Sequence, residues 1–181
     1  MIRREDMKEE VWQAMCTPMN LVLAANPRSG SGSLYLGSWM ASVDTELLQS
    51  HKITHIVQVL DVPWAQQGAA PGFVHYQIKI LDSSTAELRP HLEAACKHIR
   101  DALARGKNVL VHCQQGISRS AAVVIAYLIR QHNMTYDSAY KLVKAKRMCI
   151  KPNPGFEKTL RDWERDLRTA GVLSRTQSTS G

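Results

Sequence analysis

A cysteine and an arginine separated by five residues are the side chains in this sequence best suited to chemistry. Cys113 and Arg119 enclose a loop that contains Gly116, and an apolar run follows the arginine directly. A thiolate is a strong nucleophile, and a guanidinium can hold two phosphate oxygens with its planar fork. The pair therefore predicts nucleophilic attack on a phosphate ester.

The residues around this pair predict a phosphate-binding loop between a strand and a helix. Residues 108–112 (NVLVH) form the short apolar run of a buried strand, and residues 118–131 are apolar on every side, as in a central helix. A loop at a helix N-terminus points backbone N–H groups into one concavity, where the helix dipole adds positive potential. A phosphate dianion fits this cradle, and the same field favours a thiolate on Cys113. Attack on phosphorus would give a phosphocysteine, which water then hydrolyses.

Every residue of the loop is a candidate phosphate contact. Gly116 can adopt a backbone conformation that is costly for other residues, and Arg119 supplies the fork for two phosphate oxygens. Gln114 and Gln115 present neutral amides, and the loop has no lysine that would favour highly charged inositol phosphates. The predicted phosphate-binding residues are Gln114, Gln115, Gly116, Ile117, Ser118 and Arg119.

The elements that must position this loop alternate between strands and helices early in the chain, and helices dominate late. Strands are predicted at residues 34–36, 53–60, 73–80 and 108–112, and helices at 44–50, 87–105, 118–131, 135–146 and 155–168. This pattern predicts an α/β fold of three layers, in which helices flank a central, mainly parallel sheet.

The composition limits the remaining possibilities. The chain has 181 residues, and its 23 Lys and Arg outnumber its 16 Asp and Glu to give a net charge of +7. This length fits one domain, and the charge favours acidic partners. The four cysteines are too widely spaced for a zinc site or a disulfide scaffold, so we expect no metal and no cofactor. No apolar run approaches the ~18 residues of a membrane span and no signal peptide is visible, so we expect a soluble protein of the cytoplasm or nucleus.

The loop sequence resembles a known family. His112-Cys113-x5-Arg119-Ser120 is similar to the signature of the cysteine-based protein tyrosine phosphatases, and the residues after Gly116 (ISRSA) resemble the dual-specificity branch. The segments LYLG at 34–37, ITHIV at 53–57 and PNPGF at 152–156 resemble the same branch in order and spacing. The resemblance implies a phosphatase of the small atypical subgroup.

The resemblance divides the chain into three parts. Residues 33–168 would form the catalytic domain. An N-terminal helix over residues 1–15 and a Gly/Ser-rich loop would make up residues 1–32. Residues 169–181 are predicted to be a disordered tail.

The resemblance also implies a general acid that protonates the leaving oxygen. Asp82, which lies 31 residues before Cys113, matches the family's acid. The alternative is that Asp82 or Ser83 only caps a turn. Asp61 is the second candidate acid, but it matches no family position.

Three further residues match supporting positions of the family. Ser120 would hydrogen-bond the cysteine sulfur and help it leave, His112 would help to set the thiolate, and Asn153 would brace the loop. The alternatives are a plain helix serine at position 120 and a turn or helix cap at position 153.

The resemblance implies a phosphatase that acts on phosphotyrosine and phosphoserine/threonine in proteins, with protein kinases among its partners and neither nucleic acid nor membrane. One alternative keeps the fold but changes the substrate to a lipid, glycan or RNA 5′-phosphate. Another is a module that binds phosphoproteins without turnover. The presence of Cys113, Arg119 and Asp82 disfavours this last alternative.

Two groups of residues stay without an assigned role. Cys96 and Cys149 are expected to be small buried hydrophobes, although either could trap oxidised Cys113 as a disulfide. A basic cluster is expected to be a solvated helix face that could also steer phosphorylated substrates. Its residues are Lys141, Lys144, Lys146, Arg147 and Lys151.

Overall fold

The computed structural model describes residues 12, 17–61 and 72–174. The predicted N-terminal helix lies outside these residues apart from Trp12, as do residues 62–71 and 175–181. No helix within the described ranges is long and apolar enough to cross a membrane.

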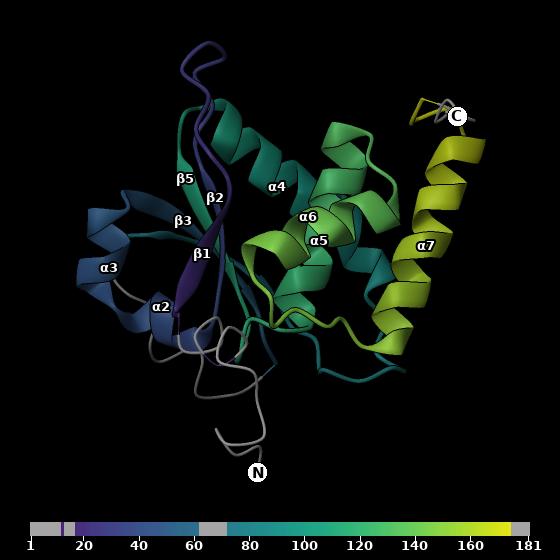
Figure 1. Ribbon diagram of the computed structural model, residues 1–181, viewed down its shortest axis with the longest axis horizontal. Helices are drawn as coiled ribbons and strands as arrows, with labels where there is room; N and C mark the ends of the chain where they lie inside the picture. Colours follow the sequence, from purple (N-terminus) through teal and green to yellow (C-terminus); the bar gives the residue numbers. More distant parts are fainter. Residues whose placement is uncertain (1–11, 13–16, 62–71, 175–181) are drawn as a thin grey trace.

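A five-stranded mixed sheet forms the centre of the molecule (Figure 1). Its strands are β1 (Met19–Leu23), β2 (Leu34–Gly37), β3 (Ile53–Val59), β4 (Val74–Ile78) and β5 (Asn108–His112). They lie in the order β1-β2-β5-β3-β4, in which β1 runs antiparallel to β2 and the other three pairs are parallel. β5 therefore lies in the middle, and the loop that follows it emerges at the carboxyl end of the parallel strands, where α/β proteins bind their ligands.

Helices cover both faces of the sheet, which confirms the predicted three-layer α/β fold (Figure 1). One face carries two short helices, α2 (Trp39–Val43) and α3 (Thr45–Ser50). The other face carries α4 (Leu92–Ala104), α5 (Arg119–His132), α6 (Tyr136–Lys146) and α7 (Pro154–Thr169), with a 3-10 turn, η3 (Arg89–His91), before α4. Each face encloses its own apolar core, and the core under α4–α7 is the larger one.

The helix that follows the loop is the most deeply buried element. Every residue of α5 from Arg119 to Ile129 is buried, because α5 packs on the sheet and is covered by α4, α6 and α7. The all-round apolar sequence predicted this central position. The start of α5, and with it the loop, is therefore held by packing on several sides.

Residues 19–23, for which the sequence predicted neither helix nor strand, form the edge strand β1. Met19 and Val22 are buried whereas Leu21 is exposed, and the register shifts between Leu21 and Leu23. This irregularity interrupts the alternation that marks a strand in a sequence. The short helix α2 was not predicted either.

The predicted disorder from residue 169 onward is wrong for residues 169–174. Thr169 belongs to α7, and the backbone N–H of Val172 donates to Leu167 O (2.9 Å) as the chain turns back. Leu173 is buried in the larger core. Burial of this leucine gives the turn an apolar contact that the low complexity of the tail does not reveal.

Candidate active site

The candidate nucleophile lies at the junction of β5 and α5. Cys113 follows the last residue of β5, and α5 begins at Arg119, so the loop joins the central strand to the central helix. Cys113 is 1% exposed. Its Sγ accepts one hydrogen bond from the Gly116 backbone N–H (3.2 Å) and another from the Ser120 hydroxyl (3.2 Å). Both donors are placed to stabilise negative charge on the sulfur.

A buried arginine from outside the loop holds the loop backbone in place. Arg147 is 0% exposed and directly follows α6. Its Nε donates to Gly116 O (2.9 Å) and its Nη2 to Gln115 O (3.1 Å). Its Nη1 donates to Thr17 O (2.8 Å) and to Asn20 Oδ1 (2.7 Å). One guanidinium therefore ties the loop to the beginning of the described chain.

Two further carbonyl groups of the loop also point outward. Gln114 O accepts from the Trp39 N–H (3.1 Å), and Ile117 O accepts from the Lys151 N–H (2.8 Å). In a trans peptide the C=O and the N–H of the next residue point in opposite directions. Outward carbonyls at residues 114–117 therefore direct the N–H groups of residues 115–118 inward. This arrangement has the geometry of the anion-binding cradle that the sequence predicts.

The turn of the loop requires glycine at position 116. Gly116 has a φ of 69°, and a Cβ at this position would lie 2.5 Å from Gly37 O at the end of β2. Any side chain would therefore meet both a strained backbone conformation and a sheet atom that cannot move away.

Arg119 places a buried guanidinium beside the loop, and one of its N–H groups makes no hydrogen bond to any described residue. Its side chain is 8% exposed. Its Nη1 donates a long hydrogen bond to Ile80 O (3.5 Å), and its Nε lies 3.7 Å from Asp82 Oδ2. Within the described residues, this Nε has no hydrogen-bond partner. A buried N–H without an acceptor is costly, so this guanidinium can bind a further acceptor.

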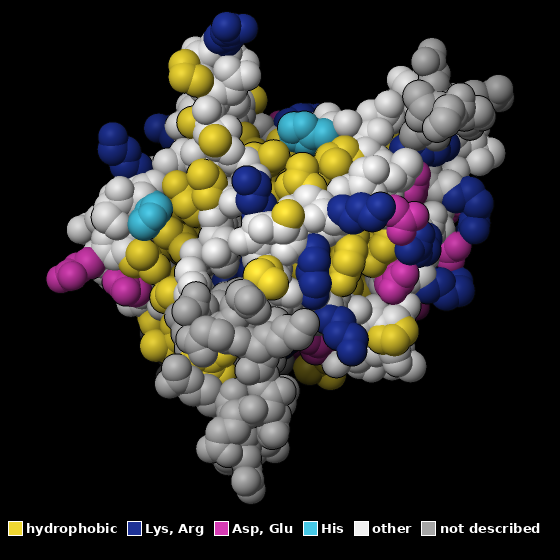
Figure 2. Space-filling model, viewed as in Figure 1, with side chains coloured by type: hydrophobic (Ala, Val, Ile, Leu, Met, Phe, Trp, Pro, Cys, Tyr) yellow, Lys and Arg dark blue, Asp and Glu magenta, His cyan; other side chains and the backbone are white. Residues whose placement is uncertain are grey.

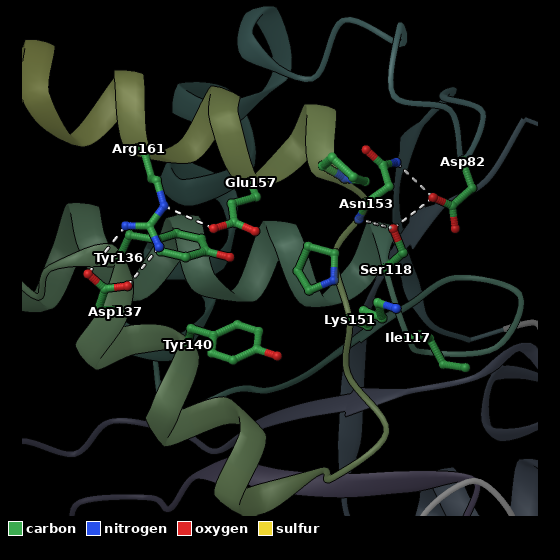
Figure 3. A pocket seen from close by; sticks show the side chains of 12 residues that line it. Asp82, Ile117, Ser118, Tyr136, Asp137, Tyr140, Lys151, Asn153, Glu157 and Arg161 are labelled. Carbon is green, nitrogen blue, oxygen red and sulfur yellow. Dashed lines mark hydrogen bonds and ion pairs between the residues drawn. The ribbon is translucent and has the colours of Figure 1, made fainter.

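Asp82 lies against the loop, held by two hydrogen bonds (Figure 3). Its Oδ1 accepts from the Ser118 hydroxyl (2.7 Å) and from Asn153 Nδ2 (2.9 Å). The adjacent Ser83 makes the local turn contact instead, because its Oγ accepts from the Thr85 N–H (3.3 Å). Asp82 therefore contacts the loop, and the neighbouring Ser83 forms the turn.

Asn153 connects the loop with α7. Its backbone N–H donates to Ser118 Oγ (3.0 Å), and its Oδ1 accepts from the Phe156 N–H (3.0 Å) at the start of α7. Both interpretations left open by the sequence are therefore present, since the residue caps a helix and also contacts the loop.

The sequence and the fold match a family of known phosphatases. The family described as "Dual specificity phosphatase, catalytic domain" matches residues 34–166 of the chain. This chain belongs to the dual specificity phosphatase family.

Several dual specificity phosphatases are similar to this chain. Dual specificity protein phosphatase MPK-4 of Drosophila melanogaster is 42% identical over 133 residues, which are 73% of this chain and 34% of that protein. Dual specificity protein phosphatase 22 of Homo sapiens is 34% identical over 132 residues, which are 73% of this chain and 70% of that protein. A crystal structure of a mouse dual specificity phosphatase complexed with zinc tungstate has a TM-score of 0.77 and 34% identity, and the match covers 87% of this chain and 93% of that chain. The chain thus spans about a third of the length of the Drosophila relative.

His112, the residue before Cys113, is buried and uncharged. It is 0% exposed, and burial lowers its pKa to about 4, so that the imidazole is neutral at neutral pH. Its Nδ1 lies 3.4 Å from Cys113 O. In this dual specificity phosphatase fold, His112 can therefore influence the thiolate through position and hydrogen bonding, but it supplies neither a positive charge nor a strong base.

The interpretation of the basic cluster is wrong for Arg147, which is buried rather than solvated. The helix α6 ends at Lys146, and the backbone of Arg147 is extended, with φ −139° and ψ 96°. The side chain therefore leaves the helical face of its neighbours and turns toward the loop. Helical periodicity cannot reveal this, because it applies only within the helix.

The contacts of the site assign no role to the remaining candidates of the sequence. Cys96 in α4 and Cys149 after Arg147 are both buried free thiols, as expected, and burial raises the pKa of each. Asp61 follows β3 and is exposed. In the described part of the chain, no group of three or more His, Cys, Asp and Glu side chains is arranged to hold a metal ion.

Proposed function

We propose that this chain hydrolyses phosphotyrosine and phosphoserine/threonine in proteins, without a metal ion, through a phosphocysteine intermediate. In the first step, the Cys113 thiolate forms a bond to phosphorus while the bond from phosphorus to the leaving oxygen breaks. Asp82, as the carboxylic acid, gives its proton to that oxygen. Positive charge comes from Arg119 and from the inward N–H groups of the loop, which stabilise the oxygens of the transferring phosphoryl group.

The second step releases phosphate. A water molecule attacks phosphorus, the bond to sulfur breaks, and the Asp82 carboxylate takes the proton of the water. The Ser120 hydroxyl, which lies 3.2 Å from Cys113 Sγ, stabilises the sulfur as it leaves with its negative charge. Asp82 thus acts first as acid and then as base from the same position.

A single observation carries the proposal. The carbonyl groups of residues 114–117 are bonded outward, to Trp39, Arg147 and Lys151, around a cysteine whose sulfur accepts two hydrogen bonds. This arrangement favours a phosphate group above the sulfur and negative charge on the sulfur itself. A phosphocysteine mechanism requires both.

The choice of a protein substrate rests on the relatives. The similar Drosophila and human proteins are named dual specificity protein phosphatases, and the mouse relative binds tungstate, a tetrahedral oxyanion. We extend the same substrate class to this chain, with phosphorylated proteins, protein kinases among them, as partners. Because the thiolate must stay reduced, the proposal implies the cytoplasm or the nucleus.

The test compares wild type with Cys113→Ser and Asp82→Asn, without metal, on an aryl phosphate with a good leaving group and on a doubly phosphorylated kinase peptide. Cys113→Ser should abolish turnover of both, since an alcohol of ordinary pKa replaces the thiolate. Asp82→Asn should lose about 100-fold or more on the peptide, whose phosphoserine or phosphothreonine oxygen needs a proton, and much less on the aryl phosphate. Asp61→Asn is the matched control and should leave both rates unchanged.

Full activity of Cys113→Ser would contradict the mechanism. An equal loss on both substrates in Asp82→Asn, or no loss, would remove Asp82 as the acid. Turnover of the aryl phosphate and of a phosphoinositide, but not of the peptide, would favour the non-protein substrate. Tight binding of the peptide without turnover in the wild type would favour the phosphoprotein-binding module.

A further inference from the structure

A groove of about 660 Å³ runs from the phosphate loop into the space between α6 and α7 (Figure 3). Asp82, Ser118 and Asn153 form one end, beside the loop. The groove then passes Tyr136, Tyr140 and Glu157 and reaches an ion pair between Arg161 and Asp137 at the far end. A peptide with its phosphorylated residue in the loop would place a flanking residue in this groove.

The wall on the α6 side of the groove is aromatic. The rings of Tyr136 and Tyr140 are stacked, with centroids 6.0 Å apart and planes at 21°. The Arg161 guanidinium already lies over the Tyr136 ring, 4.2 Å from its centroid. Tyr140 is partly exposed and presents its side chain to the open part of the groove. This wall therefore binds one guanidinium of the chain and offers the surface for a second.

The part of the groove away from the loop has a net charge opposite in sign to that of the whole chain. Arg161 is shared by two carboxylates, with Nη2 2.8 Å from Asp137 Oδ1 and Nε 3.0 Å from Glu157 Oε1. Away from the loop, these two carboxylates face a single cationic side chain of the lining, Arg161. This part of the groove thus carries an excess of one negative charge on a protein of net charge +7.

The two cationic side chains do not compete for the same end of the groove. Lys151 lies beside the loop, where the phosphate of a substrate enters, and Arg161 is occupied by its two carboxylates (Figure 3). The Glu157 side chain is 45% exposed, so water and a ligand can reach it. Figure 2 shows acidic side chains at the right, over α7, interleaved with Lys and Arg side chains, and others at the left, over α3.

We propose that this groove is a substrate subsite for a cationic side chain, arginine or lysine, that flanks the phosphorylated residue of the peptide. Glu157 would pair with this side chain, and Tyr140 would support its apolar stem and its charged head. The inference rests on the proposed phosphatase function and adds a preference among phosphorylated proteins.

The test uses phosphotyrosine peptides with alanine flanks, in which one arginine is moved along each flank one position at a time. The full chain should show a kcat/KM about fivefold higher for an arginine at one position than for the all-alanine peptide. Glu157→Gln, which keeps the shape of the side chain, should bring this ratio close to one. Asp137→Asn should lower the ratio as well, since it removes charge from the same groove.

The matched control removes a carboxylate elsewhere. Glu93 in α4 pairs with Arg130 at 2.9 Å and is 59% exposed. Glu93→Gln should keep the arginine preference of the wild type. Glu157→Lys provides the reciprocal arm, because it should prefer glutamate over arginine at the selected position. Thermal melting of each variant shows that the compared chains are folded.

The outcomes separate this inference from the function on which it rests. If the wild type turns over the aryl phosphate and the peptides but the arginine scan is flat, the subsite is overturned alone. A preference for an acidic or second phosphorylated residue, or a preference that Glu157→Gln and Asp137→Asn leave intact, also overturns it. If the wild type hydrolyses none of these phosphates, the proposed function fails and the subsite with it.

Discussion

The phosphate loop and the groove beside it each depend on one arginine, but the two arginines are held in different ways. Arg147 is 0% exposed and donates to three backbone carbonyls and one amide oxygen. The Arg161 side chain is 45% exposed and pairs with Glu157 on its own helix, α7, and with Asp137 on α6. The loop is therefore held through backbone carbonyls, whereas the groove is held through pairs of charged side chains. Substitutions of these side chains can change substrate selectivity without changing the contacts that hold the loop.

The largest expected difference between the two regions comes from replacing each arginine by methionine. Arg147→Met removes a fully buried guanidinium that donates to four acceptors, and it should lower the free energy of unfolding by about 3–5 kcal/mol, with a loss of kcat as the cradle loosens. Arg161→Met removes solvent-screened pairs and should cost ~1 kcal/mol or less. Urea unfolding of both variants measures the difference. Equal costs would show that the loop does not depend on its buried anchor.

The pH dependence of stability gives the next largest effect. Burial lowers the pKa of His112 from 6.5 to about 4, so between these values the unfolded chain binds a proton that the folded chain does not. Stability should therefore be full above pH 6.5 and fall as the pH drops toward 4, by at most about 3 kcal/mol from this group. In the groove, the Arg161 guanidinium lowers the pKa of Asp137 from 3.8. The contribution of Asp137 to stability is therefore lost only as the pH falls below 3.8.

His112→Asn isolates the histidine in this measurement. Three other histidines, His55, His98 and His132, have pKa values that desolvation also lowers, but they titrate in both chains and cancel in the comparison. Urea unfolding near pH 7.5 and near pH 4.5 should show a smaller acid loss for the variant than for the wild type. The same slope in both chains would mean that His112 is not held neutral.

The smallest expected effect compares two glycines with nearly the same backbone conformation. Gly116 and Gly171 have φ values of 69° and 70°, but only Gly116 would place a Cβ against a backbone oxygen, at 2.5 Å from Gly37 O. Gly171→Ala should cost only the strain of the left-handed conformation, about 1–2 kcal/mol. Gly116→Ala should cost ~1–3 kcal/mol more because of the overlap, and it should lose activity. Thermal melting and aryl phosphate turnover test this, and equal melting temperatures would contradict it.

Sequence reasoning was most successful where structure and chemistry share one short segment. The strand at 108–112, the loop and the buried helix α5 are contiguous, so periodicity and residue type predicted their positions together. Asp82 needed the resemblance, because a lone aspartate after a strand has the same local pattern whether it caps a turn or faces a loop. The structure separates these two cases by assigning the turn contact to Ser83.

The parts that sequence reasoning missed depend on contacts between distant residues. Arg147 lies in a run of basic residues, and only the extended backbone after α6 turns its side chain inward. The bonds from Arg147 to Thr17 and Asn20 join residues separated by 130 and 127 positions. No local pattern contains such information, since helix and strand periodicities extend over a few turns at most.

These bonds also determine where a minimal catalytic fragment must begin. The family match starts at residue 34, yet two of the four acceptors of Arg147 lie at residues 17 and 20. A fragment trimmed to the matched region would keep every residue that we assign to the reaction, but it would leave the arginine behind the loop with only half of its acceptors. The edge strand β1, which carries no catalytic group, therefore belongs to the catalytic unit.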